Sequence, residues 1–323
     1  MIRYVIRRLL WACVLFIAVT FVTYVIFYVI PANPAKLFAG KAARPEDVAR
    51  VAHNLRLDKP FYEQYWYFLS RLIFHASLGQ TFANRQDVNS IVGNAAPVTA
   101  SLVIGGAIIW MTLAIPIGIL SALRPRSVLD RSAMVFVLVG ISAHPVWIGL
   151  IFAYIFGYKL GWTPISGYCD VINPPLGASC GGPVQWAYHM LLPWCTFAIL
   201  FAALYVRMIR ANVIETMNED YVRTARAKGA PESRVMRTHI LRNAMLPVVT
   251  MLGMDIALGL GGAVFTESIY GLPGLGNTLI QSLNGFDLPT TVGIVVFATT
   301  AIIVINLIVD LAYAAIDPRI RLA

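Results

Sequence analysis

Long apolar runs without charges constrain this chain more than any other feature of its sequence. A helix needs about 20 such residues to span the hydrocarbon core of a bilayer. Six stretches reach this length with at most one charged side chain: residues 9–35, 88–123, 132–158, 171–206, 243–266 and 288–309. Since 58% of the residues are hydrophobic and only 13% are charged, an ordinary soluble domain is excluded. The sequence predicts an all-α membrane protein with about six transmembrane helices.

The basic residues orient these helices, because lysine and arginine are in excess in short cytoplasmic loops. Of the 25 Lys and Arg residues, 16 fall in the two terminal segments and in the second and fourth loops. Eight of the others lie in the long first loop, and long loops cross the membrane largely regardless of charge. Both termini are therefore predicted to be cytoplasmic. The net charge of +9 follows from this bias, so no nucleic-acid partner is expected.

This topology divides the chain into three parts. Residues 1–30 form the cytoplasmic N-terminus and the first helix, whose apolar run is too long for a cleaved signal peptide. Residues 31–95 form an extracytoplasmic region, and residues 96–323 form a membrane core of five helices. Inside that core, residues 212–246 include the fourth loop, which is cytoplasmic.

The four cysteines differ in their predicted surroundings. Cys169 and Cys180 share the outer loop between the third and fourth helices, on the oxidising side of the membrane. A disulfide there would constrain a loop rich in glycine and proline, so we predict one, with two free thiols as the alternative. Cys13 and Cys195 lie within predicted helices and are expected to be small apolar packing residues.

The search for catalytic and metal-binding motifs gives a negative result. None of the lysines is followed by Ser or Thr, so the phosphate-binding loop of P-loop ATPases is absent. No His begins an H-E-x-x-H motif, and no cysteine pair has zinc-ribbon spacing. A G-x-S-x-G match at residues 177–181 lacks the strand and helix that a nucleophile elbow requires. We therefore predict a chain that is not an enzyme and that holds no metal or cofactor.

Three acidic residues fall within or beside predicted membrane helices, where carboxylates are costly and often functional. Asp255 lies deepest, and either hydrogen-bonds another helix or lines a pathway. Glu267 follows Thr266 at the outer end of the fifth helix, where solvent is near, and is a second pathway candidate. Asp310 is expected to bond locally or to pair with an arginine of a neighbouring helix. In the third helix, Pro145 predicts a kink or break, since it removes a backbone donor.

The fourth loop predicts a helix, a turn and a second helix. Residues 218–228 are compatible with a helix that carries Tyr221, Ala225 and Lys228 on one side. Gly229 can supply the turn, and Pro231 suits the first turn of the next helix. Such a basic hairpin either docks into a groove of a soluble partner or lies on anionic lipid.

The sequence of this loop, EDYVRTARAKG followed by HILRNAMLPVV, resembles permease subunits of the dipeptide, oligopeptide and nickel class of ABC importers. Similar blocks occur along the whole chain: MIRYVIRRLL at the start, LRLDKPFYEQYWYFL at 55–69, LGQTF at 78–82, GGAVFTESIYGLPGLG at 261–276 and AAIDPRIR at 314–321. One departure is that Arg223, Thr224 and Ala225 stand where the general importer motif has Glu-Ala-Ala.

The resemblance implies a type I ABC importer permease fold and a role for the fourth loop as the helix that couples to an ATPase. This coupling helix would consist of Asp220, Tyr221, Val222, Arg223, Thr224, Ala225, Arg226, Ala227, Lys228 and Gly229. The implied partners are a paralogous second permease subunit, two cytoplasmic ABC ATPase subunits that bind the ATP and Mg²⁺, an extracytoplasmic substrate-binding protein, and membrane lipid. The implied location is the inner membrane of a prokaryote.

The implied cargo is a di- or oligopeptide, although nickel chelates and glutathione share the same permease architecture. An ion-coupled secondary transporter, with Asp255 or Glu267 as its coupling site, is the alternative from another class. No inverted repeat supports that alternative in the sequence.

Overall fold

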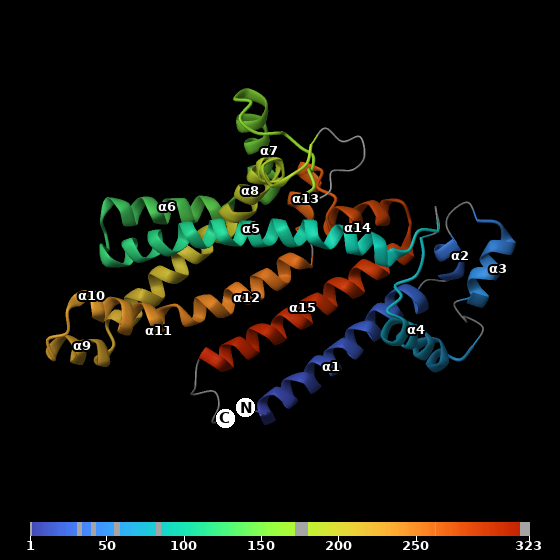
Figure 1. The fold of residues 1–323 in the computed structure, drawn as a ribbon, viewed down its shortest axis with the longest axis horizontal. Coiled ribbons are helices and arrows are strands. Elements are labelled where there is room, and N and C mark those ends of the chain that lie inside the picture. The colour runs from blue at the N-terminus through green and yellow to red at the C-terminus, as the bar shows by residue number, and fades with distance from the viewer. Residues whose placement is uncertain are drawn as a thin grey trace. The chain divides into compact units, whose positions relative to one another are not determined.

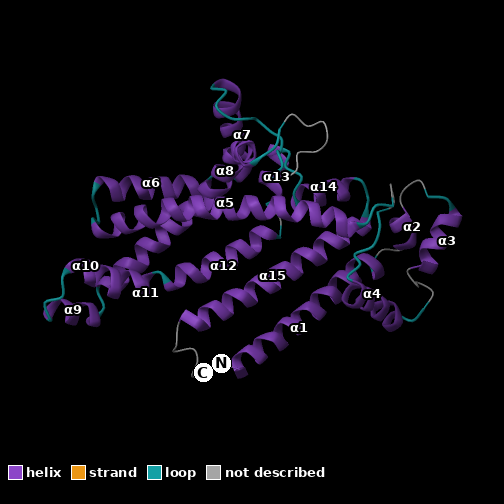
Figure 2. Cartoon of the chain, viewed as in Figure 1, coloured by secondary structure: helices purple, strands orange, loops and turns teal. Residues whose placement is uncertain are grey.

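The structure is a computed structural model that describes residues 2–30, 34–39, 43–54, 59–81, 85–171, 180–261 and 263–316. Within these ranges the chain forms helices joined by turns, with one isolated β-bridge between Gln80 and Asp87 (Figure 2). The predicted all-α fold is thus confirmed. The chain divides into two compact units, one built from residues 1–100, 257–264 and 273–323, and the other from residues 101–256 and 265–272.

The first unit contains the long helices α1 and α15, which lie side by side (Figure 1). Its elements are α1 (Ile2–Tyr24), the π-helical η1 (Val25–Val29), α2 (Pro34–Ala39), α3 (Pro45–Asn54), α4 (Phe61–His75), the first part of α5 (Val88–Leu123), α14 (Leu275–Asn284) and α15 (Leu288–Ile316). An aromatic cluster of Tyr24, Tyr28, Tyr65 and Phe68 joins α1 and η1 to α4. The aromatic residues of α4 therefore pack against those of α1 and η1.

The second unit contains the remainder of α5 and the helices that follow it. These are α6 (Val128–Ser142), α7 (Pro145–Phe152), the π-helical η2 (Ala153–Lys159), α8 (Pro183–Met217), α9 (Asp220–Ala227), α10 (Glu232–Arg234), the π-helical η3 (Val235–Leu241), α11 (Arg242–Ala244), most of α12 (Leu246–Leu260) and most of α13 (Val264–Tyr270). Gly105 lets the indole of Trp194 approach α5 closely, and that indole donates a hydrogen bond to the Ser101 carbonyl at 2.9 Å. Helix α8 is thereby fixed against α5.

Among the described residues, four helices are long and apolar enough to cross a membrane: Val5–Val29, Val88–Leu123, Pro183–Met217 and Leu288–Leu311. The number rises to six when two bent pairs each count as one span, namely Val128–Ser142 with Pro145–Lys159 and Glu232–Ala244 with Leu246–Leu260. The first pair bends by 105° at the predicted break. There, the His144 ring accepts a hydrogen bond from the Val146 amide at 3.3 Å and so caps the helix that begins at Pro145.

The predicted spans differ from the helices in their boundaries, most of all the fourth and the fifth. The fourth helix begins at Pro183 rather than at residue 171, because Gly182 adopts a φ of +96° and Pro183 suits a first helical position. That helix also continues past residue 206 to Met217, since Ile209 and Val213 remain fully buried. The fifth span ends at Leu260, and residues up to 266 belong partly to the separate helix α13.

Candidate functional site

The predicted coupling segment forms a short helix with a glycine-dependent end. Residues Asp220–Ala227 make up α9, and Lys228 and Gly229 form the turn that follows. The Gly229 amide donates to the Arg226 carbonyl at 3.0 Å, and the Ala230 amide donates to the Ala225 carbonyl at 3.2 Å. These two bonds define a Schellman motif with Gly229 in the left-handed conformation, at a φ of +75°. No other group lies where a side chain at Gly229 would begin, so only the backbone requires glycine.

A small apolar contact holds α9 to the rest of the second unit. The helix contacts η3, and Val222, Val235 and Ile240 are each fully buried. The inward residue is therefore Val222, whereas Tyr221 and Lys228 of the predicted face are exposed. In a helix of eight residues, spacing alone does not show which side faces inward, because the decisive contacts come from residues after the turn.

Polar side-chain contacts join α9 to the helices that follow it in the hairpin. Arg226 of α9 forms two hydrogen bonds with the Glu232 carboxylate of α10, at 2.6 and 3.1 Å. This bidentate contact raises the pKa of the Arg226 guanidinium above its ordinary value, so the side chain stays charged. The side-chain amide of Asn243 donates a hydrogen bond to the Tyr221 hydroxyl at 2.9 Å and connects α9 to α11.

The hairpin is also tied to the long helix from which it projects (Figure 1). Only Asn218 and Glu219 separate α8 from α9. Farther along, the Asn212 side chain donates to the Ala244 carbonyl at 3.3 Å and joins α8 to α11. The hairpin is therefore connected to α8 through the backbone, and α8 is connected to α11 through this hydrogen bond.

The outer surface of α9 is polar and accessible. Its exposed residues are Asp220, Tyr221, Arg223, Thr224, Arg226 and Ala227, followed by Lys228 and Gly229 in the turn. Arg223 pairs with Asp220 at 3.6 Å, one turn away along the same helix. A short charged helix with one buried anchor is suited to bind in a groove of a soluble partner.

The sequence did not predict the buried carboxylate of Asp130, which is bonded to Arg210 of α8. Asp130 accepts hydrogen bonds from Arg210 at 2.6 and 3.0 Å, from the Arg126 amide at 2.9 Å, and from the Ser121 hydroxyl. The cluster joins α5, the turn after it, α6 and α8. Asp130 lies just before the third predicted span, 132–158, and Arg210 lies just after the fourth, 171–206. Neither was therefore expected to be part of a membrane helix. The cap spacing of Ser127, whose hydroxyl accepts from the Asp130 amide at 3.2 Å, was the available signal.

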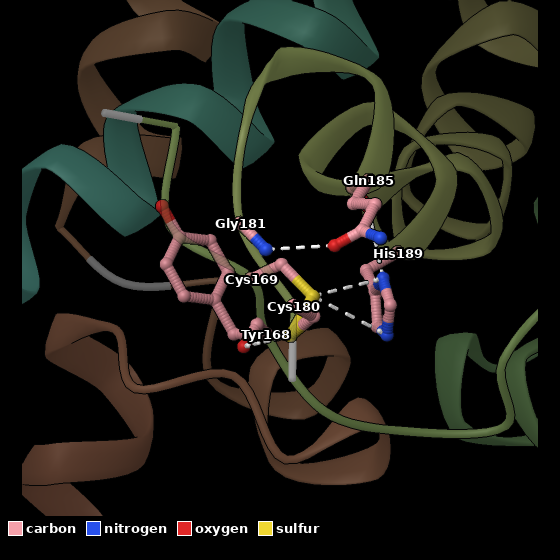
Figure 3. The surroundings of a disulfide bond; sticks show 6 residues. All are labelled: Tyr168, Cys169, Cys180, Gly181, Gln185 and His189. Carbon is pink, nitrogen blue, oxygen red and sulfur yellow. Dashed lines mark hydrogen bonds between the residues drawn. A yellow bond between two sulfur atoms is a disulfide. The ribbon is translucent and has the colours of Figure 1, made fainter. Parts of the chain in front are cut away.

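Cys169 and Cys180 are joined by a disulfide in the loop before α8, with their Cα atoms 5.5 Å apart (Figure 3). Residues 172–179 of this loop, with most of the G-x-S-x-G match, lie outside the described residues. Among the other cysteines, Cys195 is half-buried, whereas Cys13 is exposed on α1. The packing role expected for Cys13 is therefore wrong within this chain, because α1 turns that side away from its neighbours.

The three acidic residues of the predicted spans have different surroundings. The Tyr205 hydroxyl of α8 donates to Asp255 of α12 at 2.6 Å. Asp310 of α15 pairs with Arg8 of α1 at 3.0 Å, which confirms the predicted arginine partner on a neighbouring helix. Glu267 is fully buried in α13, so the expectation that solvent reaches it is wrong. Helix α12 ends at Leu260 and a new helix, α13, begins at Val264, so Glu267 lies in the middle of α13 rather than at a helix end.

Comparison with known proteins extends over nearly the whole chain. Residues 114–322 match the family described as binding-protein-dependent transport system inner membrane component, and residues 1–103 match its N-terminal family. The chain is 34% identical to a putative peptide transport system permease protein of Brucella abortus (strain 2308), with 98% of each chain covered.

Two further relatives carry more specific names. The chain is 35% identical to the dipeptide transport system permease protein DppB of Escherichia coli (strain K12) and 34% identical to the di/tripeptide transport system permease protein DppB of Pseudomonas aeruginosa (strain UCBPP-PA14). Each comparison covers 99% of both proteins. The resemblance found in the sequence is thus confirmed, and the chain belongs to the family of inner membrane components of binding-protein-dependent transport systems, as a multi-pass permease subunit of an ABC importer.

Proposed function

We propose that this permease subunit forms half of a translocation path for di- or oligopeptides and that α9 couples this path to an ATPase subunit. The peptide cargo is supported by the names of its relatives, which are peptide, dipeptide and di/tripeptide permeases. The observation that carries the coupling role is the α9 hairpin, which is exposed on its outer surface and anchored at its base.

The shape of the hairpin supports docking to a protein rather than to lipid. A helix that lies on a membrane surface needs a broad apolar face. In α9 the only fully buried apolar side chain, Val222, is already used inside the unit. The exposed side instead carries both signs of charge, since Asp220 lies beside Arg223. Mixed charge with an aromatic residue such as Tyr221 suits a groove on a soluble protein.

The connections of the hairpin support a mechanical role. ATP binding would bring two ATPase subunits together, and the docked α9 would move with its ATPase partner. Because α9 continues into α8 through two residues, and because Asn212 ties α8 to α11, that motion would reach the membrane helices on both sides of the loop. The membrane helices would then alternate between inward-facing and outward-facing arrangements.

The remaining parts of the assembly are part of the same proposal. Both termini and the α9 hairpin lie in the cytoplasm, as the distribution of basic residues indicates. ATP and Mg²⁺ bind to two separate ATPase subunits, because this chain has no P-loop sequence. A paralogous permease supplies the other half of the path. An extracytoplasmic binding protein delivers peptide to residues 31–95 and to the loop that carries Cys169 and Cys180.

Replacement of Gly229 tests the coupling role. Valine in the left-handed conformation costs about 1–2 kcal/mol and is further penalised by its branched side chain, so Gly229→Val should unwind the end of α9. Asparagine tolerates this conformation, so Gly229→Asn is the matched control. The whole complex, reconstituted in liposomes, should assemble with either variant. Peptide uptake and its stimulation of ATP hydrolysis should be lost with valine and retained with asparagine. Wild-type uptake by Gly229→Val would contradict the coupling role.

A further inference from the structure

The disulfide of the second unit has a histidine beside it that the permease function leaves unexplained. The Sγ atom of Cys169 lies 3.3 Å from Nδ1 and 3.6 Å from Nε2 of His189, which projects from the second turn of α8 (Figure 3). The two sulfur atoms and a nitrogen of this ring all lie within 4.8 Å of one another. Two thiols and an imidazole are the ligands that zinc prefers.

The histidine is held in a form suited to a metal ligand. Its Nδ1 lies 2.9 Å from the Gln185 carbonyl oxygen, one turn earlier in α8. Because a carbonyl oxygen only accepts hydrogen bonds, Nδ1 carries the proton and Nε2 keeps its lone pair. Histidines that bind metals usually donate their other ring N–H to such a carbonyl or carboxylate, which fixes the tautomer and the ring orientation.

The three ligand side chains are close enough to form a tetrahedral site by rotation. Bond lengths of about 2.3 Å for Zn–S and about 2.0 Å for Zn–N place neighbouring sulfur and nitrogen ligands roughly 3.5 Å apart, and two sulfurs roughly 3.8 Å apart. Cys169 Sγ lies 3.6 Å from His189 Nε2 and 3.3 Å from Nδ1, so it faces the ring between the two nitrogens, and the Cys169 side chain has to rotate to bring its sulfur in front of the Nε2 lone pair. With the Cα atoms of the two cysteines 5.5 Å apart, rotation of the side chains is enough to separate the sulfurs once their bond is broken.

Hydrogen bonds independent of the sulfurs keep the ligands close. The Gly182 amide donates to the Asp170 carbonyl at 3.1 Å, which joins the residues that follow each cysteine. The Gly181 amide donates to the Gln185 side chain at 2.7 Å and ties the loop to the same helix that carries His189. Reduction of the disulfide therefore leaves two links that hold both cysteines at the start of α8.

We propose that Cys169, Cys180 and His189 form a zinc-binding site when the disulfide is reduced. A thiol reductant supplies two electrons and two protons to the disulfide and is itself oxidised to a disulfide. Zn²⁺ then displaces the two thiol protons and also accepts the lone pair of His189 Nε2, and water takes the fourth position. The outer loop would thus be closed by a covalent bond under oxidising conditions and by a metal under reducing ones. This proposal does not depend on the cargo or on α9.

Cobalt titration of the complete complex tests the site, since Co²⁺ bound by thiolates gives an intense sulfur-to-metal absorption. The background carries Cys13→Ser and Cys195→Ser in this chain and has no reactive cysteines in its partner subunits. After reduction with a phosphine, which becomes a phosphine oxide and leaves no competing thiol, one Co²⁺ per chain should bind and Zn²⁺ should displace it. The oxidised complex should give no such signal.

Single substitutions then identify the ligands. Cys169→Ser or Cys180→Ser should abolish the absorption, and His189→Ala should weaken Co²⁺ binding at least about 10-fold. His75→Ala, which removes an exposed histidine of α4, should change nothing. A reduced complex that remains monodisperse but gives no sulfur-to-cobalt absorption would overturn the proposal.

A second measurement tests the site without substituting its ligands. In the reduced complex, Zn²⁺ should slow alkylation of Cys169 and Cys180 at least about 10-fold, measured by mass spectrometry of their peptides. Equal alkylation rates with and without Zn²⁺ would show that the three side chains do not hold the metal.

Discussion

Two arginine–carboxylate pairs of the second unit have the same bidentate geometry but opposite surroundings. Arg210 binds Asp130 and Arg226 binds Glu232, each with a shortest contact of 2.6 Å. In the first pair the Asp130 side chain is only 7% exposed and Arg210 is 27% exposed, whereas in the second the side chains of Arg226 and Glu232 are 37% and 61% exposed. Asp130 also accepts hydrogen bonds from the Ser121 hydroxyl and from the Arg126 backbone amide. Among the described residues, the side-chain partner of Glu232 is Arg226.

The difference separates a contact that stabilises the fold from a contact that shapes an exposed hairpin. Breaking a buried pair leaves a charge without water or a partner, which destabilises a fold strongly. Breaking an exposed pair lets water replace the lost contact. The Asp130 cluster therefore fixes α5, α6 and α8 together, while the Arg226–Glu232 pair only shapes the α9 hairpin. We therefore expect the exposed pair to contribute less to stability than the Asp130 cluster.

The largest effect should come from Asp130→Ala. Removal of the carboxylate leaves Arg210 and the Ser121 hydroxyl without their partner, at a cost of about 3 kcal/mol in unfolding free energy. Thermal unfolding of the purified complex in detergent measures this loss. Glu232→Ala is the matched control and should unfold at nearly the wild-type temperature.

A paired replacement sharpens this comparison. In Asp130→Leu combined with Arg210→Met, both charges are gone, so much of the stability lost in Asp130→Ala should return. If Asp130→Ala and Glu232→Ala lower the unfolding temperature equally, burial does not distinguish the two pairs and the comparison is wrong.

An intermediate effect is expected from Val222→Ala. The substitution removes about two buried methylene equivalents, or about 1.6 kcal/mol, from the contact between α9 and η3. Because the contact is local, hydrogen exchange should accelerate in α9 and η3 and stay unchanged in α5. Lys228→Ala, at an exposed position just after α9, serves as the control. Faster exchange throughout the second unit would mean that the hairpin is part of the structural core.

The smallest effect should come from the exposed pair itself. Glu232→Gln keeps the shape of the side chain and removes its charge, so the hairpin should stay folded and lose only salt-dependent stabilisation. Thermal unfolding at low and high salt should give the same temperature for the variant. A large drop at both salt concentrations would show that water does not replace this contact.

Features written in local sequence were predicted well. The bounds of α5, residues 88–123, follow from its uncharged length, the break before α7 from Pro145, and the end of α9 from Gly229. Each depends on a property that one residue or one run carries by itself. The permease family was likewise recognisable from the sequence of the fourth loop.

Features that depend on contacts between distant residues were not predicted. Arg210 and Asp130 are 80 positions apart in the sequence, and the residues that flank each of them do not indicate that the two side chains pair. His189 lies beside the disulfide because α8 begins only after Gly182, so that His189 is in its second turn. The apolar run from residue 171 had predicted an earlier start of this helix. The burial of Glu267 likewise follows from the separate helix α13, where an uninterrupted span was expected.

The most direct test of the account is a cross-link between α9 and the ATPase subunit. In a chain with Cys13→Ser and Cys195→Ser, a single cysteine replaces exposed Arg223, or Lys159 at the end of η2 as the control. With a short bifunctional reagent, Arg223→Cys should join the ATPase subunit in the intact complex, and Lys159→Cys should not. Failure of Arg223→Cys to cross-link, in a complex that retains its ATPase subunits and transports peptide, would contradict the proposal that α9 is the coupling helix.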